Sequence, residues 1–221
     1  TPADAWGPEA GPAPDPPSVA APVPAASSHL PTRESSGPAP YLRARPKSRA
    51  RRHDRFKQDD ETPRVAETLL EVVEQEGPIE LELACRRVLD AYGFKRSTAK
   101  AIERVRESLP DVEAPLRPHA LDGFLWPPRR DPDTHAGFRG VTPDGSTPRQ
   151  AEELPLEEVA NAARWVLDQN LSLEAVDLAR ETAKLFGFGR LGSQLERRMR
   201  AGIEQLAASG RCRLEGERVV G

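Results

Sequence analysis

"LFGFGRLGSQLERRM" spans residues 185–199, and its three glycines, at 187, 189 and 192, have the G-x-G-x-x-G spacing of a dinucleotide-binding turn. Such a turn follows a β-strand, whose end aims the turn at the pyrophosphate. Here the preceding residues have the apolar spacing of a helix, and Ser193 and Gln194 stand where a phosphate-binding P-loop requires Lys and Ser or Thr. We therefore interpret the stretch as a turn between two helices and expect no cofactor and no small-molecule ligand.

An imperfect copy of this stretch lies earlier in the chain. Residues 65–110 align with residues 159–204 at a shift of 94 positions without a gap, and 11 of the 46 aligned pairs are identical. The first copy reads "GFKRST" and keeps only Gly93, the glycine that a left-handed residue at a helix C-terminus requires. We therefore predict a duplicated unit of about 65 residues.

Each copy is predicted to contain three helices. The first has apolar residues at i, i+4, i+7 and i+8, the stripe of an amphipathic helix. These residues are Val65, Leu69, Val72 and Val73 in one copy and Val159, Ala163, Val166 and Leu167 in the other. A second helix precedes the Gly-Phe pairs at 93–94 and 187–188, and a third helix follows them.

Beyond the third helix, each copy has the signal of a β-hairpin. "HALDGFLW" (119–126) turns on Asp122-Gly123, and "CRLEGERVV" (212–220) turns on Glu215-Gly216. Three helices followed by a two-stranded hairpin is the plan of a winged helix-turn-helix unit. The predicted fold class is mainly α with small β-hairpins (α+β), arranged as tandem winged helix-turn-helix-like repeats.

Four segments are expected along the chain. Residues 1–57 hold 12 of the 23 prolines and few large apolar residues, so we expect a disordered Pro/Ala-rich linker with a basic segment at 41–57. Residues 58–128 are expected to form the first repeat and residues 155–221 the second. Residues 129–154 would connect the repeats as a loop with a small hairpin.

Charge is distributed unevenly over these segments. The basic segment carries eight Lys/Arg against one acid, net +7, whereas residues 58–221 carry 23 basic and 30 acidic residues, net −7. The basic segment suits either a solvated tail or a sequence-independent grip on nucleic acid phosphates. The third helices are also basic. Residues 95–107 hold five basic and two acidic residues and residues 189–200 hold four and one, net +3 in each case.

The third helices are therefore the candidate nucleic-acid interface. With Leu195 and Met199 directed inward, Gln194, Arg197 and Arg198 are expected to face solvent, as the residues of a recognition helix do. The predicted nucleic-acid-binding residues are Lys95, Arg96, Lys100, Arg104, Arg190, Gln194, Arg197 and Arg198, together with the wing residues Arg211 and Arg213. The alternative is an ordinary solvated face, because basic residues near helix C-termini and i, i+4 charge pairs are common on surfaces.

Other classes of site are not expected. Cys85 and Cys212 have unrelated spacing and the four histidines form no ligand pattern, so we expect no metal site and a reducing, cytoplasmic setting. No run of 18 apolar residues exists, so we expect no membrane partner. The chain opens with Thr1, so we expect a piece of a longer protein, and we find no catalytic pattern in this piece.

Four separate blocks carry a resemblance to a known family. They are "EGPIELELACRRVLDAYGFKRST" (76–98), "DGFLWP" (122–127), "AEELPLEEVANAARWVL" (151–167) and "ETAKLFGFGRLGSQLERRM" (181–199). They resemble the uncharacterised C-terminal domain of large bacterial superfamily I DNA/RNA helicase-like proteins. The resemblance implies that the ATPase and any nuclease sites lie upstream of this chain, and that the helicase motor of the same polypeptide is a partner.

The sequence thus predicts a non-catalytic accessory module at the C-terminus of a helicase-type ATPase. It would bind nucleic acid, with DNA favoured, through phosphate contacts from the basic third helix of each repeat. One alternative is a protein-interaction module that docks onto its own motor or another partner. A further alternative is a transcription regulator.

Overall fold

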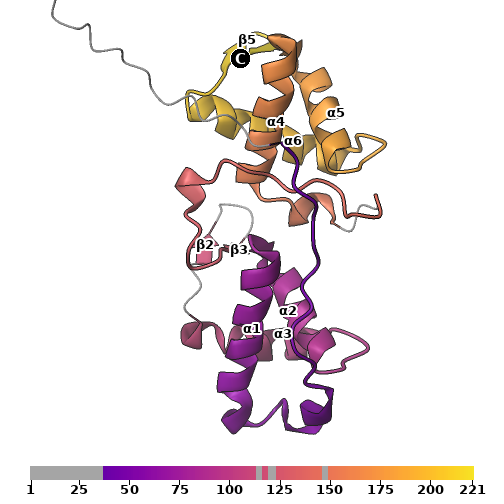
Figure 1. Ribbon diagram of the computed structural model, residues 1–221, viewed down its shortest axis with the longest axis vertical. Helices are drawn as coiled ribbons and strands as arrows, with labels where there is room; N and C mark the ends of the chain where they lie inside the picture. Colours follow the sequence, from indigo (N-terminus) through magenta and orange to yellow (C-terminus); the bar gives the residue numbers. More distant parts are fainter. Residues whose placement is uncertain (1–36, 113–115, 119–122, 146–148) are drawn as a thin grey trace, which may run out of the picture. The chain divides into compact units, whose positions relative to one another are not determined.

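The computed structural model describes residues 37–112, 116–118, 123–145 and 149–221 (Figure 1). All of these residues belong to one folded unit. Within the described ranges, none of the helices has both the length and the apolar character needed to cross a bilayer.

The first repeat is built from three helices and a three-stranded antiparallel sheet with the strand order β1-β3-β2. In the sheet, Leu125 lies opposite Ile79 on one side and opposite Leu116 on the other. The elements are α1 (Thr62–Glu76), β1 (Ile79–Glu80), α2 (Leu81–Ala91), α3 (Ala99–Arg106), β2 (Leu116–Pro118) and β3 (Gly123–Leu125).

The second repeat has the same element order, and its strands are ordered β4-β6-β5. The elements are α4 (Leu156–Asn170), β4 (Ser172–Glu174), α5 (Ala175–Leu185), α6 (Ser193–Ala208), β5 (Arg213–Glu215) and β6 (Arg218–Val220). Helices α4 and α5 begin and end 94 residues after α1 and α2, and α6 begins 94 residues after α3. The shift found in the sequence is therefore also the shift between structural elements.

Short 3-10 helices complete the described structure. They are η1 (Ala50–Arg55), η2 (Asp59–Glu61), η3 (Leu109–Asp111), η4 (Pro132–Thr134) and η5 (Ala151–Glu153). The expected α+β class, mainly helical with small antiparallel hairpins, is confirmed. The first strand of each sheet was not predicted, since β1 and β4 are only two and three residues long. The expected turn at Asp122 lies outside the described residues, whereas Gly216 has a left-handed φ of 63° at the second hairpin turn.

Each repeat has its own apolar core, formed by the predicted helix stripes. In the first repeat the core includes Val65, Leu69, Val72, Val88, Leu89, Tyr92 and Val105. In the second repeat it includes Val159, Ala163, Val166, Leu178, Ala183, Met199 and Ile203. The amphipathic pattern therefore identified the buried faces correctly.

The glycine-rich stretch of residues 185–199 is a helix end followed by a turn. Gly187 has φ 87° and Gly93 has φ 81°, both left-handed. The amide of Phe188 donates to the Ala183 carbonyl at 3.1 Å, and the amide of Phe94 donates to the Leu89 carbonyl at 3.0 Å. This is the hydrogen-bond pattern with which a glycine commonly ends a helix. The interpretation as a turn between helices is confirmed.

The expectation of a disordered segment over residues 1–57 is wrong for residues 37–57, and residues 1–36 lie outside the described structure. Tyr41 and Phe56 are each only 1% exposed. Phe56 packs its ring edge-on against Tyr92, with the ring centroids 5.1 Å apart. The segment is thus part of the folded unit, and we call residues 41–57 the basic strap.

The connecting segment 129–154 also packs between elements of both repeats. The Ala39 amide donates to the Phe138 carbonyl at 3.1 Å, and the Gly140 amide donates back to the Ala39 carbonyl at 2.8 Å. The expected turn is present at Gly145, whose amide donates to the Thr142 carbonyl at 2.8 Å. Residues 146–148 lie outside the described structure, so the second half of the predicted hairpin does too.

Candidate nucleic-acid interface

The turn before α3 presents three of the predicted basic residues to solvent. Lys95, Arg96 and Lys100 are all exposed. Thr98 caps the helix, since its Oγ1 accepts from the Ala101 amide at 3.3 Å and so starts α3 directly after the basic turn. Among the described residues, none of the three cations forms an ion pair with a carboxylate. They are available to an external anion.

The second repeat repeats this arrangement at the turn before α6. Arg190, Gln194 and Arg197 are exposed, while Leu195 and Met199 are buried, as the helix pattern predicted. Within the described ranges, neither Arg190 nor Arg197 forms an ion pair. In the view of Figure 1 the α2–α3 turn and the α5–α6 turn both extend to the right of the molecule.

Arg104 does not face solvent as expected. Its Nη2 donates to Thr62 Oγ1 at 2.7 Å and to the Gln58 carbonyl at 3.0 Å, and its side chain is 13% exposed. The reason is that α3 packs against the start of α1, where these oxygens need a donor. Arg104 is therefore a structural residue that joins α3 to α1.

The prediction for Arg198 is also wrong. The residue is 8% exposed, and its Nε donates to the Leu154 carbonyl at 2.7 Å. Its guanidinium lies over the Phe124 ring, 5.5 Å from the centroid. Helix α6 is flanked by the end of the connecting segment, so a residue on the outer side of the helix pattern is covered by another part of the chain.

The two predicted wing residues differ from each other. Arg211 is half-buried and donates to Asn161 Oδ1 at 2.7 Å, which ties it to α4. Arg213 is exposed on β5. In the first repeat, strand β3 is packed inward, because Phe124 is 3% exposed and Leu125 is fully buried. Of the wing candidates, Arg213 is the one that can reach an external phosphate.

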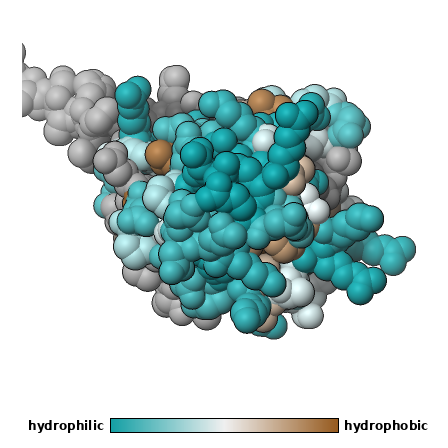
Figure 2. Space-filling view, turned by 90° about the horizontal axis from the view of Figure 1, so that it is seen from below, coloured by the Kyte–Doolittle hydropathy of each residue, from teal (hydrophilic) through white to brown (hydrophobic). Residues whose placement is uncertain are grey.

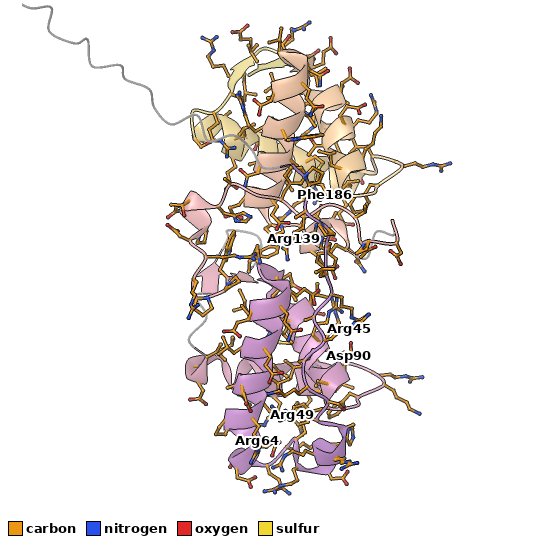
Figure 3. The ribbon with its side chains drawn as sticks, viewed as in Figure 1. Arg45, Arg49, Arg64, Asp90, Arg139 and Phe186 are labelled. Atoms are coloured by element: carbon orange, nitrogen blue, oxygen red, sulfur yellow. The ribbon has the colours of Figure 1, made fainter. Side chains whose placement is uncertain are left out.

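The basic strap is bound to the acidic face of α1 and to α2. Arg49 pairs with Glu67 at 2.9 Å, and Lys47 donates its amide to Glu71 at 2.9 Å. Arg43 pairs with Asp90 of α2 at 2.6 Å. Figure 3 shows Arg45 and Arg49 of the strap beside the helices of the first repeat. The strap is thus neither a solvated tail nor a free phosphate-binding segment, because the protein's own acids neutralise much of its charge.

The end of the first repeat that η1 and the start of α1 form is hydrophilic on its outer surface. Figure 2 shows the face around η1 and the start of α1, which is hydrophilic over most of its area and has only small, separate hydrophobic patches. Arg52 of η1 pairs with the fully buried Glu61, with 2.7 Å between Nε and Oε1. This hydrogen bond from Arg52 is the main cause that lowers the pKa of Glu61.

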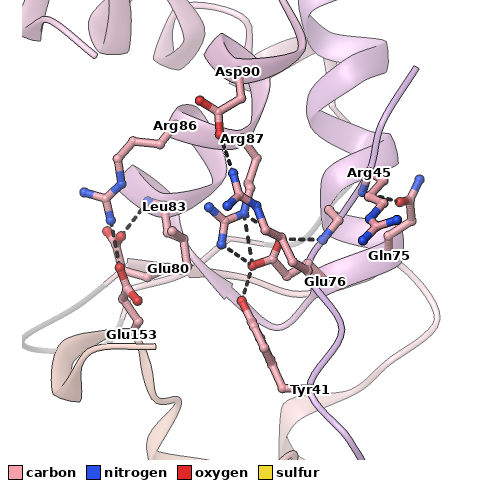
Figure 4. Close-up of polar contacts among 12 residues, drawn as sticks. Tyr41, Arg45, Gln75, Glu76, Glu80, Leu83, Arg86, Arg87, Asp90 and Glu153 are labelled. Carbon is pink, nitrogen blue, oxygen red and sulfur yellow. Dashed lines mark hydrogen bonds and ion pairs between the residues drawn. The ribbon is translucent and has the colours of Figure 1, made fainter. Parts of the chain in front are cut away.

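Glu76, at the C-terminal end of α1, is the centre of a buried polar cluster (Figure 4). Arg87 donates to it at 2.9 Å, the Ala44 amide donates at 2.7 Å, and the Tyr41 hydroxyl donates as well. Burial acts to raise the pKa of Glu76, but these hydrogen bonds outweigh burial and hold the pKa below its ordinary value. Burial and the neighbouring Glu76 carboxylate raise the pKa of Tyr41, so the phenol remains a donor.

The lowered pKa of Glu76 predicts a stability effect that depends on pH. A carboxyl group whose pKa is lower in the folded state contributes stability above its unfolded pKa of about 4.3, and loses it as the pH falls through the folded value. We expect the difference in unfolding free energy between the wild type and Glu76→Gln to be constant from pH 7 to about 5, and to shrink steadily below about pH 4. Urea unfolding at each pH measures it. A difference that does not change with pH would mean that the ionised form is not what the cluster stabilises.

A second buried cluster joins the connecting segment to both repeats. Glu158 of α4 pairs with Arg139 at 2.6 Å and with Arg149 at 2.8 Å. Arg139 also donates to the carbonyls of Glu76 and Pro78 in the first repeat. Arg149 lies over the Tyr41 ring, 4.4 Å from the centroid. These contacts fix the strap, the connecting segment and the first helix of each repeat to one another.

Comparison with known proteins gives one family match. A model of a family described as proteins of unknown function (DUF3320) matches residues 54–102, from η1 into α3. No curated protein matches the chain, and no solved structure does. The match covers most of the helical part of the first repeat and supports an uncharacterised domain there.

Proposed function

We propose that the chain is a tandem winged helix-turn-helix module that binds nucleic acid phosphates, with DNA as the favoured ligand. The observation that carries the proposal is that exposed cations with no ion pair among the described residues lie before and within the third helix of both repeats, with Arg96 and Arg190 at equivalent positions. The proposed contact residues are Lys95, Arg96, Lys100, Arg190, Gln194, Arg197 and Arg213. Arg104, Arg198 and Arg211 are excluded from this set because protein oxygens hold them.

The element order supports the winged-helix assignment. In a helix-turn-helix protein the second helix of the motif, here α3 or α6, presents its N-terminal residues to the DNA. The proposed contact cations of α3 and α6 lie at this end of each helix, whereas Arg106, exposed at the C-terminal end of α3, pairs with Glu103 at 3.9 Å. A sheet whose first strand precedes the motif and whose other two strands follow it occurs in both repeats.

The overall charge sets the expected strength of binding. Residues 37–221 carry 31 basic and 31 acidic residues, net 0, so they exert no net long-range attraction on phosphates. Binding must then be local, weak for each repeat and sensitive to salt. Two repeats on one chain raise the effective concentration of the second site once the first has bound.

A helicase-type ATPase is the enzyme that such a module would serve. This part of the proposal rests on the resemblance of the four sequence blocks, and the family match to proteins of unknown function is compatible with it. The module would hold nucleic acid near the motor and would itself have no catalytic step.

Fluorescence anisotropy with a labelled DNA duplex and a labelled single strand tests the binding. At low salt the wild type should bind at least one of them, and each phosphate contact should add about 0.9 to the slope of log affinity against log salt. The variant with Lys95→Glu, Arg96→Glu and Lys100→Glu should lose the part of the affinity, and of its salt slope, that the first repeat contributes. The variant with Arg190→Glu and Arg197→Glu should lose the part that the second repeat contributes.

Arg129→Glu is the matched control, because Arg129 is an exposed cation of the connecting segment and belongs to neither turn. It should bind as the wild type does. No binding by the wild type at low salt, or equal losses in the control and the turn variants, would reject the proposal.

A second candidate function, docking onto a protein partner, is favoured by one observation. A groove between α4 and α5, lined by residues that include Trp165 and Lys184, corresponds at the shift of 94 residues to the part of α1 and α2 on which the basic strap lies, where the Ala44 amide donates to Glu76.

A further inference from the structure

The second repeat has a groove of about 440 Å³ between α4 and α5. The residues that line it include Trp165, Gln169, Asn170, Leu173, Lys184 and Leu185. None of them belongs to the proposed nucleic-acid interface. The groove mixes one partly exposed aromatic ring, two side-chain amides and charged groups, a combination that suits a peptide better than an apolar ligand.

Each of these residues has a counterpart 94 positions earlier in the first repeat. The pairs are Trp165 with Glu71, Gln169 with Gln75, Asn170 with Glu76, Leu173 with Ile79, Lys184 with Asp90, and Leu185 with Ala91. Because α1 and α4 have the same bounds at this shift, and α2 and α5 do too, the two grooves are structurally equivalent.

In the first repeat, the basic strap lies along the equivalent groove in an irregular conformation with no helix or strand before Ala50. Its backbone amides are the main donors. Arg45 donates to Gln75 Oε1 at 2.9 Å, and Ala44 donates to Glu76 at 2.7 Å. Near the other end, Arg49 donates to the Ala91 carbonyl at 2.7 Å. The groove of the first repeat is therefore a peptide-binding groove whose ligand is part of the same chain.

The second repeat keeps the acceptors that recognise a peptide backbone. The side-chain amide nitrogen of Gln169 donates to the Trp165 carbonyl at 2.9 Å, and that of Asn170 donates to the Val166 carbonyl at 2.8 Å. The carbonyl oxygen of each side-chain amide can then accept from a ligand, as Gln75 does in the first repeat. In the described part of the chain, no backbone amide donates to either oxygen.

Two substitutions between the grooves change what side chains the ligand must carry. Arg43 of the strap pairs with Asp90, and the counterpart of Asp90 is Lys184, which has the opposite charge. Lys47 and Arg49 of the strap approach Glu71, and the counterpart of Glu71 is the aromatic Trp165. Lys184 pairs with Glu181 of the same groove at 2.7 Å, an exposed i,i+3 pair of a kind that contributes little to stability. A ligand of the second groove therefore places an acidic residue opposite Lys184, in competition with Glu181, and an apolar residue opposite Trp165.

An exposed apolar residue directly follows α4 in the chain. Leu171 is 84% exposed and has a left-handed φ of 56°, which costs energy for a residue with a side chain. Its counterpart Gly77 is covered in the first repeat: a side chain there would meet Pro127, and Arg130 donates to the Gly77 carbonyl at 3.0 Å. The position that Pro127 and Arg130 cover in the first repeat is thus exposed in the second.

We propose that the α4–α5 groove binds an extended, acidic and apolar peptide segment of another protein, in the way that the first repeat binds the basic strap. The partner's backbone amides donate to Gln169 and Asn170. Its acidic side chain pairs with Lys184, and its apolar side chain packs on Trp165. This proposal does not depend on nucleic-acid binding, because the two surfaces share no residue.

Two labelled peptides test the proposal on the full chain by fluorescence anisotropy. One has the strap sequence of residues 40–49, PYLRARPKSR. The other is PYLEARPLSR, which carries glutamate at the position of Arg43 and leucine at the position of Lys47. The wild type should bind the second peptide saturably and the first more weakly. Trp165→Ala should weaken binding of the second peptide by about tenfold, as loss of a buried aromatic anchor does.

A charge exchange separates a specific contact from a general loss of structure. Lys184→Glu should lower the affinity for the glutamate peptide by about two- to fivefold and raise the affinity for the strap peptide by a similar factor. A misfolded groove cannot produce this exchange. Arg129→Glu should change neither affinity, and neither Lys184→Glu nor Trp165→Ala should change DNA binding. No saturable binding of the glutamate peptide, or no exchange of preference in Lys184→Glu, would overturn the proposal. Self-association of the chain that Trp165→Ala abolishes would assign the groove to a second copy and overturn it too.

Discussion

Replacing Glu158 by glutamine is expected to lower the free energy of unfolding by about 3–5 kcal/mol, the loss typical of breaking a buried ion pair by removing one partner. Glu158 is 1% exposed and lies between Arg139 and Arg149. Burial acts to raise its pKa, but the two arginines outweigh burial and hold the pKa below the ordinary range. Without the carboxylate, two guanidinium groups would remain buried with no counter-charge.

Urea unfolding at pH 7 measures this effect, and Glu157→Gln is the matched control. Glu157 is the preceding residue of α4 but is only partly buried, and no ion pair is seen for it among the described residues. Its replacement should change the free energy of unfolding by no more than about 0.5 kcal/mol. If the two variants lose the same amount, the buried cluster does not hold the connecting segment in place.

The helices and their buried faces could be predicted because their signals are local. The apolar stripe beginning at Val65 and its copy at Val159 lie 94 residues apart, as do the helices they belong to. Gly93 and Gly187 were assigned to helix ends from the sequence, and both have the left-handed φ that the assignment requires. By contrast, strands of two or three residues carry no period, so β1 and β4 could not be recognised.

The order of residues 37–57 could not be predicted from local patterns, because its causes lie far along the chain. Arg43 pairs with Asp90 and Arg49 with Glu67, at separations of 47 and 18 residues. One signal was present in the sequence. The basic segment 41–57 has a net charge of +7, and residues 61–82 have seven acids and one base, net −6. Opposite charges of this size in one chain favour an internal pairing over a free tail.

The candidate interface could be predicted only in part, because segments far along the chain cover some of its residues. The helix pattern correctly placed Lys100 and Arg197 on exposed faces, since exposure on a single helix follows its period. Arg104 and Arg198 lie on comparable positions but are covered, one by the start of α1 and the other by the Leu154 carbonyl of the connecting segment. The pattern of one helix says nothing about which other segments lie across it.

Gly202→Ala is expected to lower the free energy of unfolding by about 1–3 kcal/mol, even though alanine is the better helix former by about 1 kcal/mol. Gly202 lies in the middle of α6 where this helix crosses α4. A Cβ atom at this position would lie 2.3 Å from Val159 Cγ1 and 2.6 Å from Val159 Cβ, so one helix must move. Because both helices supply core residues of the second repeat, that movement disturbs the whole core.

Gly189→Ala is the matched control. Gly189 is the second glycine of the G-x-G-x-x-G stretch before α6. Gly189 has no left-handed φ, and a Cβ atom there would meet nothing within 4 Å. Its replacement should leave stability unchanged or raise it by up to about 1 kcal/mol, since alanine restricts the unfolded chain. Thermal unfolding of both variants measures the contrast. The loss caused by Gly202→Ala should be smaller in a Val159→Ala background than in the wild type, because Val159→Ala removes the nearest clashing atom, Cγ1. An equal loss in the two backgrounds would show that the crossing of α4 and α6 is not the cause.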